Sequence, residues 1–576
     1  MRSNEAIFKT ESMRIDDRNL QATIRKMRDR VLEDIRVDKA EVLEILAVVR
    51  PLAPKYGEMA EFVRLLERVL EDGKVTPEES VRVGAYLTWL TREDGQAAPP
   101  VRETGFLGRV FRLGRNRTTV KTEVIAGITM FMTMAYILAV NPSILSVAGV
   151  PRGGVFVATA LAAVVGTLLM AVLSNYPFVL APGMGLNAFL TFGVCKGMGY
   201  SWQFALLAVF VEGLVFLALS LTPVREAIFN CIPSTLKKAV TAGIGLFICF
   251  IALQTSGVIG DNGAVLVQMI KFREAPIHST GICALLALVG TILTAVMTAW
   301  RWKGAILIGI FATWGLGMLA QATGLYVPDP SARCLSLYPS LTFAGLADTF
   351  KSFGDTFCAI FDPAGWTHTV DGKVAGSGWS LALSLDFFVV MFAFFFVDLF
   401  DTLGALIGVS MKGGFLTKEG KLPRISGALC ADAIATSVGA LFGTSTTTTC
   451  VESASGVMAG GRTGLASVTS AALFALALVF APVFLAIPAF ATAPALIIVG
   501  YMMLSSAVEI DFTDPGEAFP AFLTIVGMPF AYSVSEGIMW GIISYTLVNL
   551  IAGRARKIHW IMYVLTLLFI AKYALM

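Results

Sequence analysis

Apolar runs, each about the length needed to cross a membrane, follow one another along most of the chain. About 20 apolar residues in a helix cross the roughly 30 Å hydrocarbon core of a bilayer. The runs predict fourteen spans, at 122–146, 153–174, 179–195, 203–222, 228–256, 281–300, 303–320, 383–410, 424–442, 447–460, 464–487, 491–509, 517–533 and 536–552. The pattern therefore predicts an all-α polytopic membrane protein. An apolar C-terminal segment, 553–576, remains, and its stretch 558–575 either spans the membrane or lies in the interface.

The first hundred residues follow a different pattern, in which apolar positions recur at helical spacing among many charges. Such series are Val42, Leu43, Ile45, Leu46 and Val49, then Phe62, Leu65, Leu66, Val69 and Leu70. Thr76-Pro77-Glu78-Glu79 supplies an N-cap, a proline at the first helical position and first-turn acids, which open a further helix. We therefore expect a small helical soluble domain at 1–104, which weakly resembles TerB-like helical domains through its DGKVTPEE turn. A basic linker at 105–121 joins it to a membrane domain at 122–552.

Composition excludes several classes of function. The chain of 576 residues is 56% hydrophobic and 15% charged, and 17 of its 44 Lys and Arg and 19 of its 41 Asp and Glu lie within residues 1–100. Such a chain is not a soluble enzyme. Its net charge of +3 is too small and dispersed for nucleic acid. The eight cysteines show no CxxC spacing, and three histidines provide neither a nucleophile–base pair nor a metal cluster, so we expect no enzyme activity and no metal site.

Basic residues set the expected orientation. Arg109, Arg112, Arg115, Arg117 and Lys121 precede the first span. By the positive-inside rule the N-terminus is cytoplasmic and the protein is a multi-pass protein of the cell membrane. The first twenty residues contain no apolar signal-peptide core, which agrees with this orientation. The long connection 321–382 then lies outside, where Cys334 and Cys358 form a disulfide if the compartment is oxidising or otherwise stay free thiols.

Internal repetition suggests how the spans are arranged. Residues 158–169 in the second span echo 431–442 in the ninth, and 303–310 in the seventh echo 536–542 in the fourteenth. Seven spans per half, an odd number, would place the two halves in opposite orientations. Inverted repeats of this kind are common in secondary transporters, whose binding sites lie between the halves near the middle of the membrane.

Two predicted spans contain residues that a regular helix does not favour. In the third, 181–185 (APGMG) precedes 186–189 (LNAF), and in the tenth, 443–449 (GTSTTTT) precedes 450–456 (CVESASG). We expect extended backbone that gives way to a helix inside the membrane. Two such half-helices would direct free N–H groups towards a polar or partly anionic ligand. The alternative is that glycine and threonine serve only close helix packing.

The ionisable residues well inside the spans are few and all acidic, with no lysine or arginine among them. They are Glu212, Asp386, Asp398, Asp401, Asp432 and Glu452. Burial in hydrocarbon favours the protonated form of a carboxyl, so an all-acidic interior suits a cation-coupled carrier better than an anion exchanger. Asp398 and Asp401 are three residues apart, and we expect their shared helix face to meet the tenth span. For Asp386, Glu212 and Asp432 we expect structural hydrogen bonds.

Four of these segments resemble the AzgA-like purine permeases of the nucleobase:cation symporter-2 family, also called nucleobase–ascorbate transporters. They are TEVIAGITMFMTMAYILAVNPSIL at 122–145, APGMGLNAF at 181–189, FFFVDLFDTLG at 394–404 and GTSTTTTCVESASGV at 443–457. The resemblance implies fourteen spans in 7+7 inverted repeats, with a core domain at 122–222 and 383–487 and a gate domain at 223–320 and 488–552. It also implies proton-coupled uptake of adenine, hypoxanthine and guanine by an elevator-like movement of core against gate.

The resemblance also assigns residues. It implies that Glu452, Asp398 and Asn187 bind the purine, with Ser453 and Phe189 as further candidates, and that Asp401, Glu452 and Asp398 serve proton coupling or gating. No cofactor is expected beyond the co-transported H⁺, for which Na⁺ is the alternative. Membrane lipid is the expected environment. A homodimer and a cytoplasmic partner of the N-terminal domain are left open.

Other functions are kept as alternatives. One is a carrier of the same fold for xanthine, uracil or a small anion, which for an anion would need a basic residue at the half-helices. Another is a membrane purine sensor that signals through residues 1–104.

Overall fold

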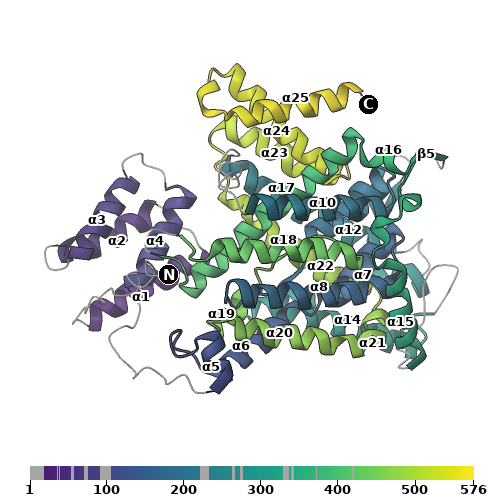
Figure 1. The fold of residues 1–576 in the computed structure, drawn as a ribbon, viewed down its shortest axis with the longest axis horizontal. Coiled ribbons are helices and arrows are strands. Elements are labelled where there is room, and N and C mark those ends of the chain that lie inside the picture. Colours follow the sequence, from purple (N-terminus) through teal and green to yellow (C-terminus); the bar gives the residue numbers. More distant parts are fainter. Residues whose placement is uncertain are drawn as a thin grey trace.

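Helices make up most of the structure, and most of them run in one direction through a single bundle. The computed structural model describes residues 18–575 except 35–36, 38, 54–56, 71–74, 91–104, 221–232, 263–265, 273–276, 328–336, 339–342, 371–372 and 418–420. The four N-terminal helices form a separate group beyond one end of the bundle (Figure 1). They are α1 (Arg18–Asp34), α2 (Lys39–Val49), α3 (Gly57–Leu70) and α4 (Pro77–Leu90). We call these helices the head and this end of the bundle the head side.

The bundle elements follow in two series. Before the long connection come α5 (Gly105–Phe111), α6 (Val120–Met134), α7 (Ile137–Leu145), α8 (Arg152–Leu173), β1 (Leu180–Pro182), α9 (Met184–Ala188), the π-helix η4 (Phe189–Gly197), α10 (Trp202–Ser220), α12 (Ser234–Thr255), β2 (Ile259–Asn262), β3 (Leu266–Met269), the π-helix η5 (Ile277–Gly281), α13 (Ile282–Ala299) and α14 (Ala305–Ala322). After it come α17 (Leu385–Gly413), α18 (Ile425–Phe442), β6 (Thr447–Thr449), α19 (Ser453–Met458), α20 (Gly464–Ala477), α21 (Ala481–Ala486), α22 (Ala489–Leu504), α23 (Pro515–Phe530), α24 (Val534–Ile551) and α25 (Trp560–Leu575).

Hydropathy and length make this a multi-pass membrane protein. Among the described residues, eleven helices are long and apolar enough to cross a membrane, and each falls on a predicted span. The third and tenth predicted spans are instead split into β1 with α9 and η4, and β6 with α19. The thirteenth corresponds to α23, which is shorter. The total of fourteen spans stays a prediction.

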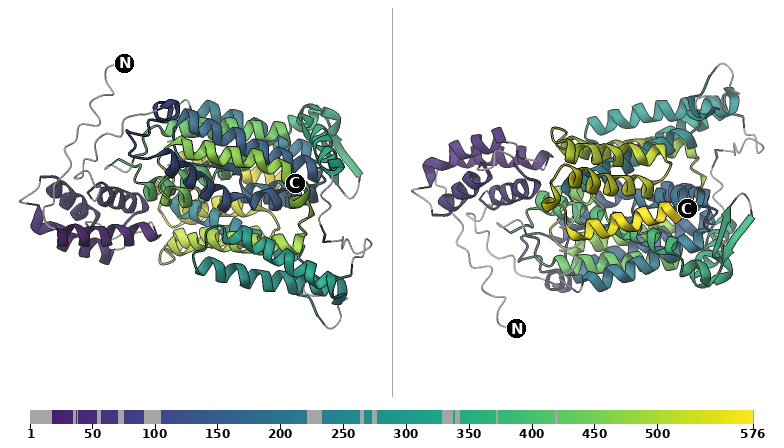
Figure 2. Two further views of the ribbon diagram at one scale, coloured as in Figure 1. Left: turned by 90° about the horizontal axis from the view of Figure 1, so that it is seen from below. Right: turned by 90° about the horizontal axis from the view of Figure 1, so that it is seen from above.

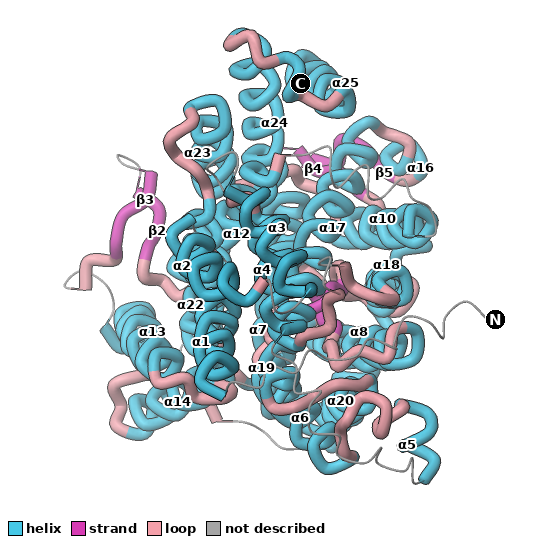
Figure 3. Tube along the Cα trace, turned by 90° about the vertical axis from the view of Figure 1, so that its left-hand side faces the viewer, coloured by secondary structure: helices cyan, strands magenta, loops and turns pink. Residues whose placement is uncertain are grey.

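The bundle helices pack in two groups. In one, α8 packs against α18 and α20, and α10 packs against α17 and α18. In the other, α12 packs against α22 and α23, and α13 packs against α14 and α22. Seen from the head side, the two groups lie on opposite sides of the bundle (Figure 3). The predicted division into core and gate domains uses the same helices and stays a prediction.

Helices α8 and α18, which contain the echoing segments, pack antiparallel. A Cβ on Gly166 would lie 2.8 Å from the Cβ of Ala435, and a Cβ on Gly427 would lie 2.5 Å from the carbonyl oxygen of Leu173. As the residue number rises on one helix it falls on the other. Glycine therefore permits a backbone approach that a larger residue would block at both contacts.

The long connection forms the end of the bundle opposite the head (Figures 1 and 2). It contains α15 (Phe343–Thr356), α16 (Trp379–Ala382) and the hairpin of β4 (Thr367–Val370) with β5 (Lys373–Ser377). We call this end the hairpin side. The head and this connection thus lie at opposite ends of the bundle, as expected, while their assignment to cytoplasm and exterior stays a prediction. Cys334 lies outside the described residues, so its pairing with Cys358 also stays a prediction.

The C-terminal helix α25 turns back beside α24. Trp540 donates to Tyr573 at 3.1 Å and the Thr566 hydroxyl donates to that of Thr546 at 2.8 Å, which is the order of contacts in an antiparallel pair. The helix therefore follows the direction of the bundle, as expected of the spanning alternative rather than the interfacial one.

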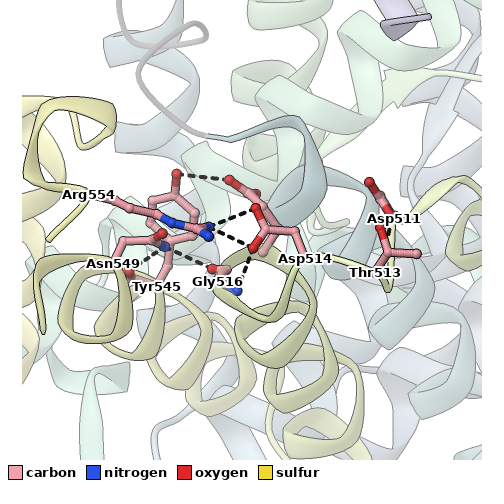
Figure 4. A network of polar contacts seen from close by, with 8 residues as sticks. Asp511, Thr513, Asp514, Gly516, Tyr545, Asn549 and Arg554 are labelled. Carbon is pink, nitrogen blue, oxygen red and sulfur yellow. Dashed lines mark hydrogen bonds and ion pairs between the residues drawn. The ribbon is translucent and has the colours of Figure 1, made fainter. Parts of the chain in front are cut away.

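A polar network ties the head-side ends of α23 and α24 (Figure 4). Arg554 Nη1 contacts Asp514 Oδ1 at 2.6 Å and Oδ2 at 2.8 Å, and Asp514 also accepts from the backbone N–H of Gly516 at the start of α23. Asn549 on α24 donates to the Gly516 carbonyl oxygen at 2.8 Å. The bonds to Asp514 raise the pKa of Arg554 above its ordinary value, so this basic end of the bundle stays charged.

The head contacts the bundle through α4 and the end of α17. The start of α4 has the predicted cap, since the Thr76 hydroxyl and N–H both donate to Glu79 Oε2 at 2.8 Å. Further along, α4 packs against α17, and buried residues of α4 and of the later part of α17 belong to one apolar cluster. A Cβ on Gly84 would lie 2.2 Å from Met411 Cε and 3.2 Å from Val31 Cγ1. The predicted turn at 71–74 and most of the predicted linker fall outside the described residues.

Gly84→Leu tests this contact. We expect it to loosen the head from α17, because overpacking a buried contact costs about 1–3 kcal/mol. Hydrogen–deuterium exchange should then rise at α4 and at the last turns of α17. Arg82→Leu, which places the same side chain on the exposed face of α4, should leave exchange unchanged, and adding Met411→Ala to Gly84→Leu should restore part of the protection. Unchanged exchange in Gly84→Leu would argue against the contact.

Candidate functional site

Two extended segments, one from each broken span, pair at the centre of the site. Strands β1 and β6 are antiparallel, with Leu180 opposite Thr449 and Pro182 opposite Thr447. The Gly183 N–H donates to the Thr446 carbonyl at 3.0 Å, and the Cys450 N–H donates to the Val179 carbonyl at 3.0 Å. In hydrocarbon, backbone polar groups must be satisfied within the protein, and here each extended segment supplies partners for the other. The expected extended backbone followed by a helix is confirmed in both spans.

Asn187 joins the two broken spans rather than pointing at a carboxyl. It lies in α9, is fully buried, and accepts a hydrogen bond from the Ser445 hydroxyl, which is also fully buried. Its Nδ2 lies 3.9 Å from the thioether sulfur, Sδ, of Met184. Among the described residues the amide N–H groups of Asn187 have only this weak acceptor, and so they keep donor capacity.

Glu452 follows β6 directly and meets a tyrosine from another helix. The hydroxyl of Tyr136, at the break between α6 and α7, donates to Glu452 Oε1 at 2.9 Å. Asp401 on α17 is close enough to Glu452 for the two carboxyls to interact electrostatically. Both acids are partly exposed, unlike the other acids of the bundle centre. These three residues form what we call the carboxyl face: Tyr136, Asp401 and Glu452.

Asp398 lies one turn before Asp401 on α17 and its carboxyl interacts with that of Asp401, but its other neighbours are different. That both acids bind the base or couple protons stays a prediction. Asp398 is fully buried, its Oδ1 accepts from the Thr402 hydroxyl at 3.3 Å, and its carboxyl interacts with those of Glu212 and Asp432. Residues three apart in a helix differ by about 60° in direction. That angle is enough for α17 to direct Asp401 towards α19 and β6 while Asp398 points towards α10 and α18.

Two further candidates are held by packing and backbone contacts. The Phe189 ring is fully buried, with its centroid 4.7 Å from that of Phe394. Ser453 is also fully buried, and its Oγ accepts from the Val179 N–H at 2.9 Å. Both side chains support the broken spans, and neither has surface free for a ligand in this conformation. The Phe400 side chain lies outside the described residues.

The three acids expected to make structural hydrogen bonds divide into two kinds. Asp386 accepts from the Tyr200 hydroxyl at 2.8 Å, and Asp432 accepts from the hydroxyls of Thr402 at 2.8 Å and Thr449 at 3.1 Å, as expected. Glu212 differs, because among the described residues no N–H or hydroxyl donates to either of its carboxyl oxygens, and its side-chain partner is another acid, Asp398. The described part of the chain also contains no group of three or more His, Cys, Asp or Glu arranged to hold a metal ion.

Tyr136 is the residue of this site that sequence reasoning missed. It lies in the first motif, MAYILAVNP, where a tyrosine in an apolar run has no evident polar partner. The available signal was that a buried tyrosine hydroxyl usually needs a hydrogen-bond partner. Its partner, Glu452, lies 316 residues further along the chain and so could not be named.

Comparison with known proteins identifies the family. A family model described as a permease family matches residues 121–540, which include both broken spans and every acid of the bundle centre. The chain belongs to this permease family. The match begins after the head, at the start of α6.

Two curated relatives match this permease over nearly all of their own length. The guanine/hypoxanthine permease PbuO of Bacillus subtilis is 40% identical over 80% of this chain and 98% of its own. The adenine permease AdeP of Escherichia coli is 38% identical over 81% of this chain and 96% of its own. Among solved structures, the transmembrane domain of a cyanobacterial bicarbonate transporter, BicA, is similar with a TM-score of 0.47 and 14% identity, over 72% of this chain and 97% of that one.

Ser445→Ala tests the link between the broken spans of the permease. It removes the hydroxyl that donates to Asn187, and an unsatisfied buried acceptor costs about 1–3 kcal/mol. We expect a lower midpoint of thermal unfolding for the purified protein in detergent. Ser544→Ala is the control, because that hydroxyl bonds carbonyls of its own helix α24. Equal midpoints for the two variants would contradict the proposed link.

Proposed function

We propose that this permease takes up purine nucleobases, namely adenine, hypoxanthine and guanine, by proton-coupled symport. Permeases named for guanine, hypoxanthine and adenine are its relatives over most of the chain, which supports a nucleobase substrate. The observation that carries the proposal is the carboxyl face, where Glu452 and Asp401 lie together beside two broken spans. Acids in a membrane protein are expensive to bury and mark substrate or ion pathways.

The chemistry of a purine fits this face. Its edge alternates N–H donors with ring-nitrogen and carbonyl acceptors. Carboxylates at Glu452 and Asp401 would accept from the base, while free N–H groups would donate to it and the Tyr136 hydroxyl would hold Glu452 in place. A base that leaves one of these buried groups unpaired would bind more weakly, and this difference would give the selectivity. Asn187 would contribute its remaining amide donor from the opposite broken span.

Roles for the other predicted residues follow their positions. Asp398, Ser453 and Phe189 would act on the base indirectly, through α17 and the two broken spans, in the conformation described. Asp401, Glu452 and Asp398 are the acids proposed for proton coupling or gating, and of these Asp401 and Glu452 are partly exposed. The co-transported ion in this proposal is H⁺, with Na⁺ as the alternative.

We also propose elevator-like alternating access between two inverted repeats. The antiparallel packing of α8 on α18, the pairing of β1 with β6, and the two groups of packed helices support it. The group with α17 would carry the base past the group with α12. The head would be cytoplasmic in a cell membrane, in line with the basic residues that precede α6.

Uptake by cells expressing the chain tests the function. Labelled adenine, hypoxanthine and guanine should accumulate and a protonophore should abolish the accumulation, whereas xanthine and uracil should accumulate less. Glu452→Gln should lose uptake, because an amide cannot accept from the base at both of its terminal atoms. Glu536→Gln is the matched control, because the Glu536 carboxyl accepts from the Tyr573 hydroxyl on α25. This variant should take up the bases as wild type does.

The same experiment separates the alternatives. Uptake of xanthine or uracil above the purines would reassign the substrate. Binding of a purine without accumulation would favour a sensor, whose output deletion of residues 1–104 should abolish. No uptake and no binding of any base, with the protein present at the cell surface, would contradict the proposed function.

Tyr136→Phe tests the hydrogen bond to Glu452. It removes one hydroxyl and keeps the ring, and a hydrogen bond to a charged group contributes about 1.5–3 kcal/mol. We expect the KM for hypoxanthine to rise about tenfold, since 1.4 kcal/mol corresponds to about a factor of ten in affinity. Tyr545→Phe, which removes a hydroxyl bonded to Glu517 instead, should keep the wild-type KM. An unchanged KM in Tyr136→Phe would remove Tyr136 from the site.

A further inference from the structure

Glu212 is the acid of the bundle that the proposed site leaves without a role. It lies near the middle of α10 and is fully buried. In the described structure neither oxygen accepts from an N–H group or a hydroxyl. By contrast, Asp386, Asp398, Asp432 and Glu452 each accept from a hydroxyl. A buried carboxylate with no donor costs several kcal/mol, so its protonation state needs an explanation.

The neighbours of Glu212 are two more acids. Its carboxyl interacts with those of Asp398 on α17 and Asp432 on α18. Helices α10 and α18 also pack closely here, because a Cβ on the next residue, Gly213, would lie 2.4 Å from Ser437 Oγ of α18. Asp398 Oδ2 also lacks a hydrogen-bond partner. Three unmatched acceptor oxygens therefore belong to the facing carboxyls of Glu212 and Asp398.

Too few donors are present for three charged carboxylates. The Thr402 hydroxyl lies 3.3 Å from Asp398 Oδ1 and 2.8 Å from Asp432 Oδ2, and it has one hydrogen for both. Of the three acids, only Asp432 accepts from the Thr449 hydroxyl. In the described structure no Lys, Arg or His contacts these acids. Asp401 is the next acid along α17, and the η4 residues Cys195 and Lys196 lie at the hairpin-side end of α10.

We propose that Glu212 and Asp398 share one proton, and that this buried pair holds the proton that the permease co-transports. This proton site rests on the proposed function. It adds Glu212 to that function and places the co-transported proton away from the carboxyl face. In the loaded form a proton taken from water is bound to one carboxyl, whose O–H donates to the other carboxylate. Release returns that proton to water and leaves two carboxylates.

The same network offers a connection to the base. Thr402 links Asp398 to Asp432, and Thr449 links Asp432 to β6, the strand that precedes Glu452. Asp398 and Asp401 also lie on one turn of α17. A base bound at the carboxyl face would therefore change the packing and hydrogen bonding of the same strand and helix that hold the proton pair.

Proteoliposomes containing the full chain and labelled hypoxanthine test the pair. Under an imposed pH gradient, wild type should accumulate hypoxanthine above the external concentration and move protons with it, detected with a trapped pH dye. Glu212→Gln should lose both but keep exchange of internal for external hypoxanthine. Asp386→Asn is the matched control, because Asp386 lies on the same helix as Asp398 and accepts a single hydroxyl, that of Tyr200, which the asparagine oxygen can still accept; it should keep coupled accumulation.

The outcomes distinguish the two proposals. Coupled accumulation in Glu212→Gln, with wild-type coupling intact, would overturn the proton pair alone. Accumulation by wild type without proton movement would overturn proton coupling in the proposed function, and the pair with it. If Glu212→Gln is not stable enough to reconstitute, Glu212→Asp keeps a titratable group at an altered distance. We then expect a shifted pH profile of driven uptake with an unchanged exchange rate, and an unchanged profile would overturn the pair.

Discussion

The need to satisfy every backbone N–H and C=O group inside hydrocarbon determines the centre of this protein. A helix satisfies its own groups, but the segments before α9 and α19 are extended and cannot. Each therefore pairs with the other, as β1 with β6. The residues around this pair, from Thr444 to Thr449, are buried and polar, and the hydroxyls of Thr444, Ser445 and Thr449 bond other segments of the bundle. The acids of the site take their positions from this pair and from α17 beside it.

The long spans and the broken ones could be predicted because their causes are local. Apolar runs fix where a helix can cross, and the prolines and glycines of 181–185 show where a helix cannot continue. The proximity of Asp401 to the tenth span also followed from position. The direction of Asp398 did not, because the rotation of α17 depends on packing against α10 and α18. Such packing is set by close contacts such as those at Gly213, which no local pattern reveals.

Partners distant in the chain explain the other differences. The hydrogen bond of Tyr136 to Glu452 and the isolation of Glu212 both depend on which helices become neighbours. The same is true of the head. Its helices could be read from their periodicity and from the cap at Thr76, but its contact with Met411 could not. Because α17 also carries Asp398 and Asp401, the head is attached to the helix that holds the site.

The pairing of β1 with β6 has a consequence for biogenesis. Asn187 and Ser445, which join the same two spans, are 258 residues apart. During synthesis, the first broken span therefore enters the membrane long before its partner has been translated. Its extended backbone must meanwhile be satisfied by water, by the insertion machinery or by a provisional fold, because lipid offers no hydrogen bonds. Contacts this distant in sequence form late. Insertion of the second half is thus the step that completes the first.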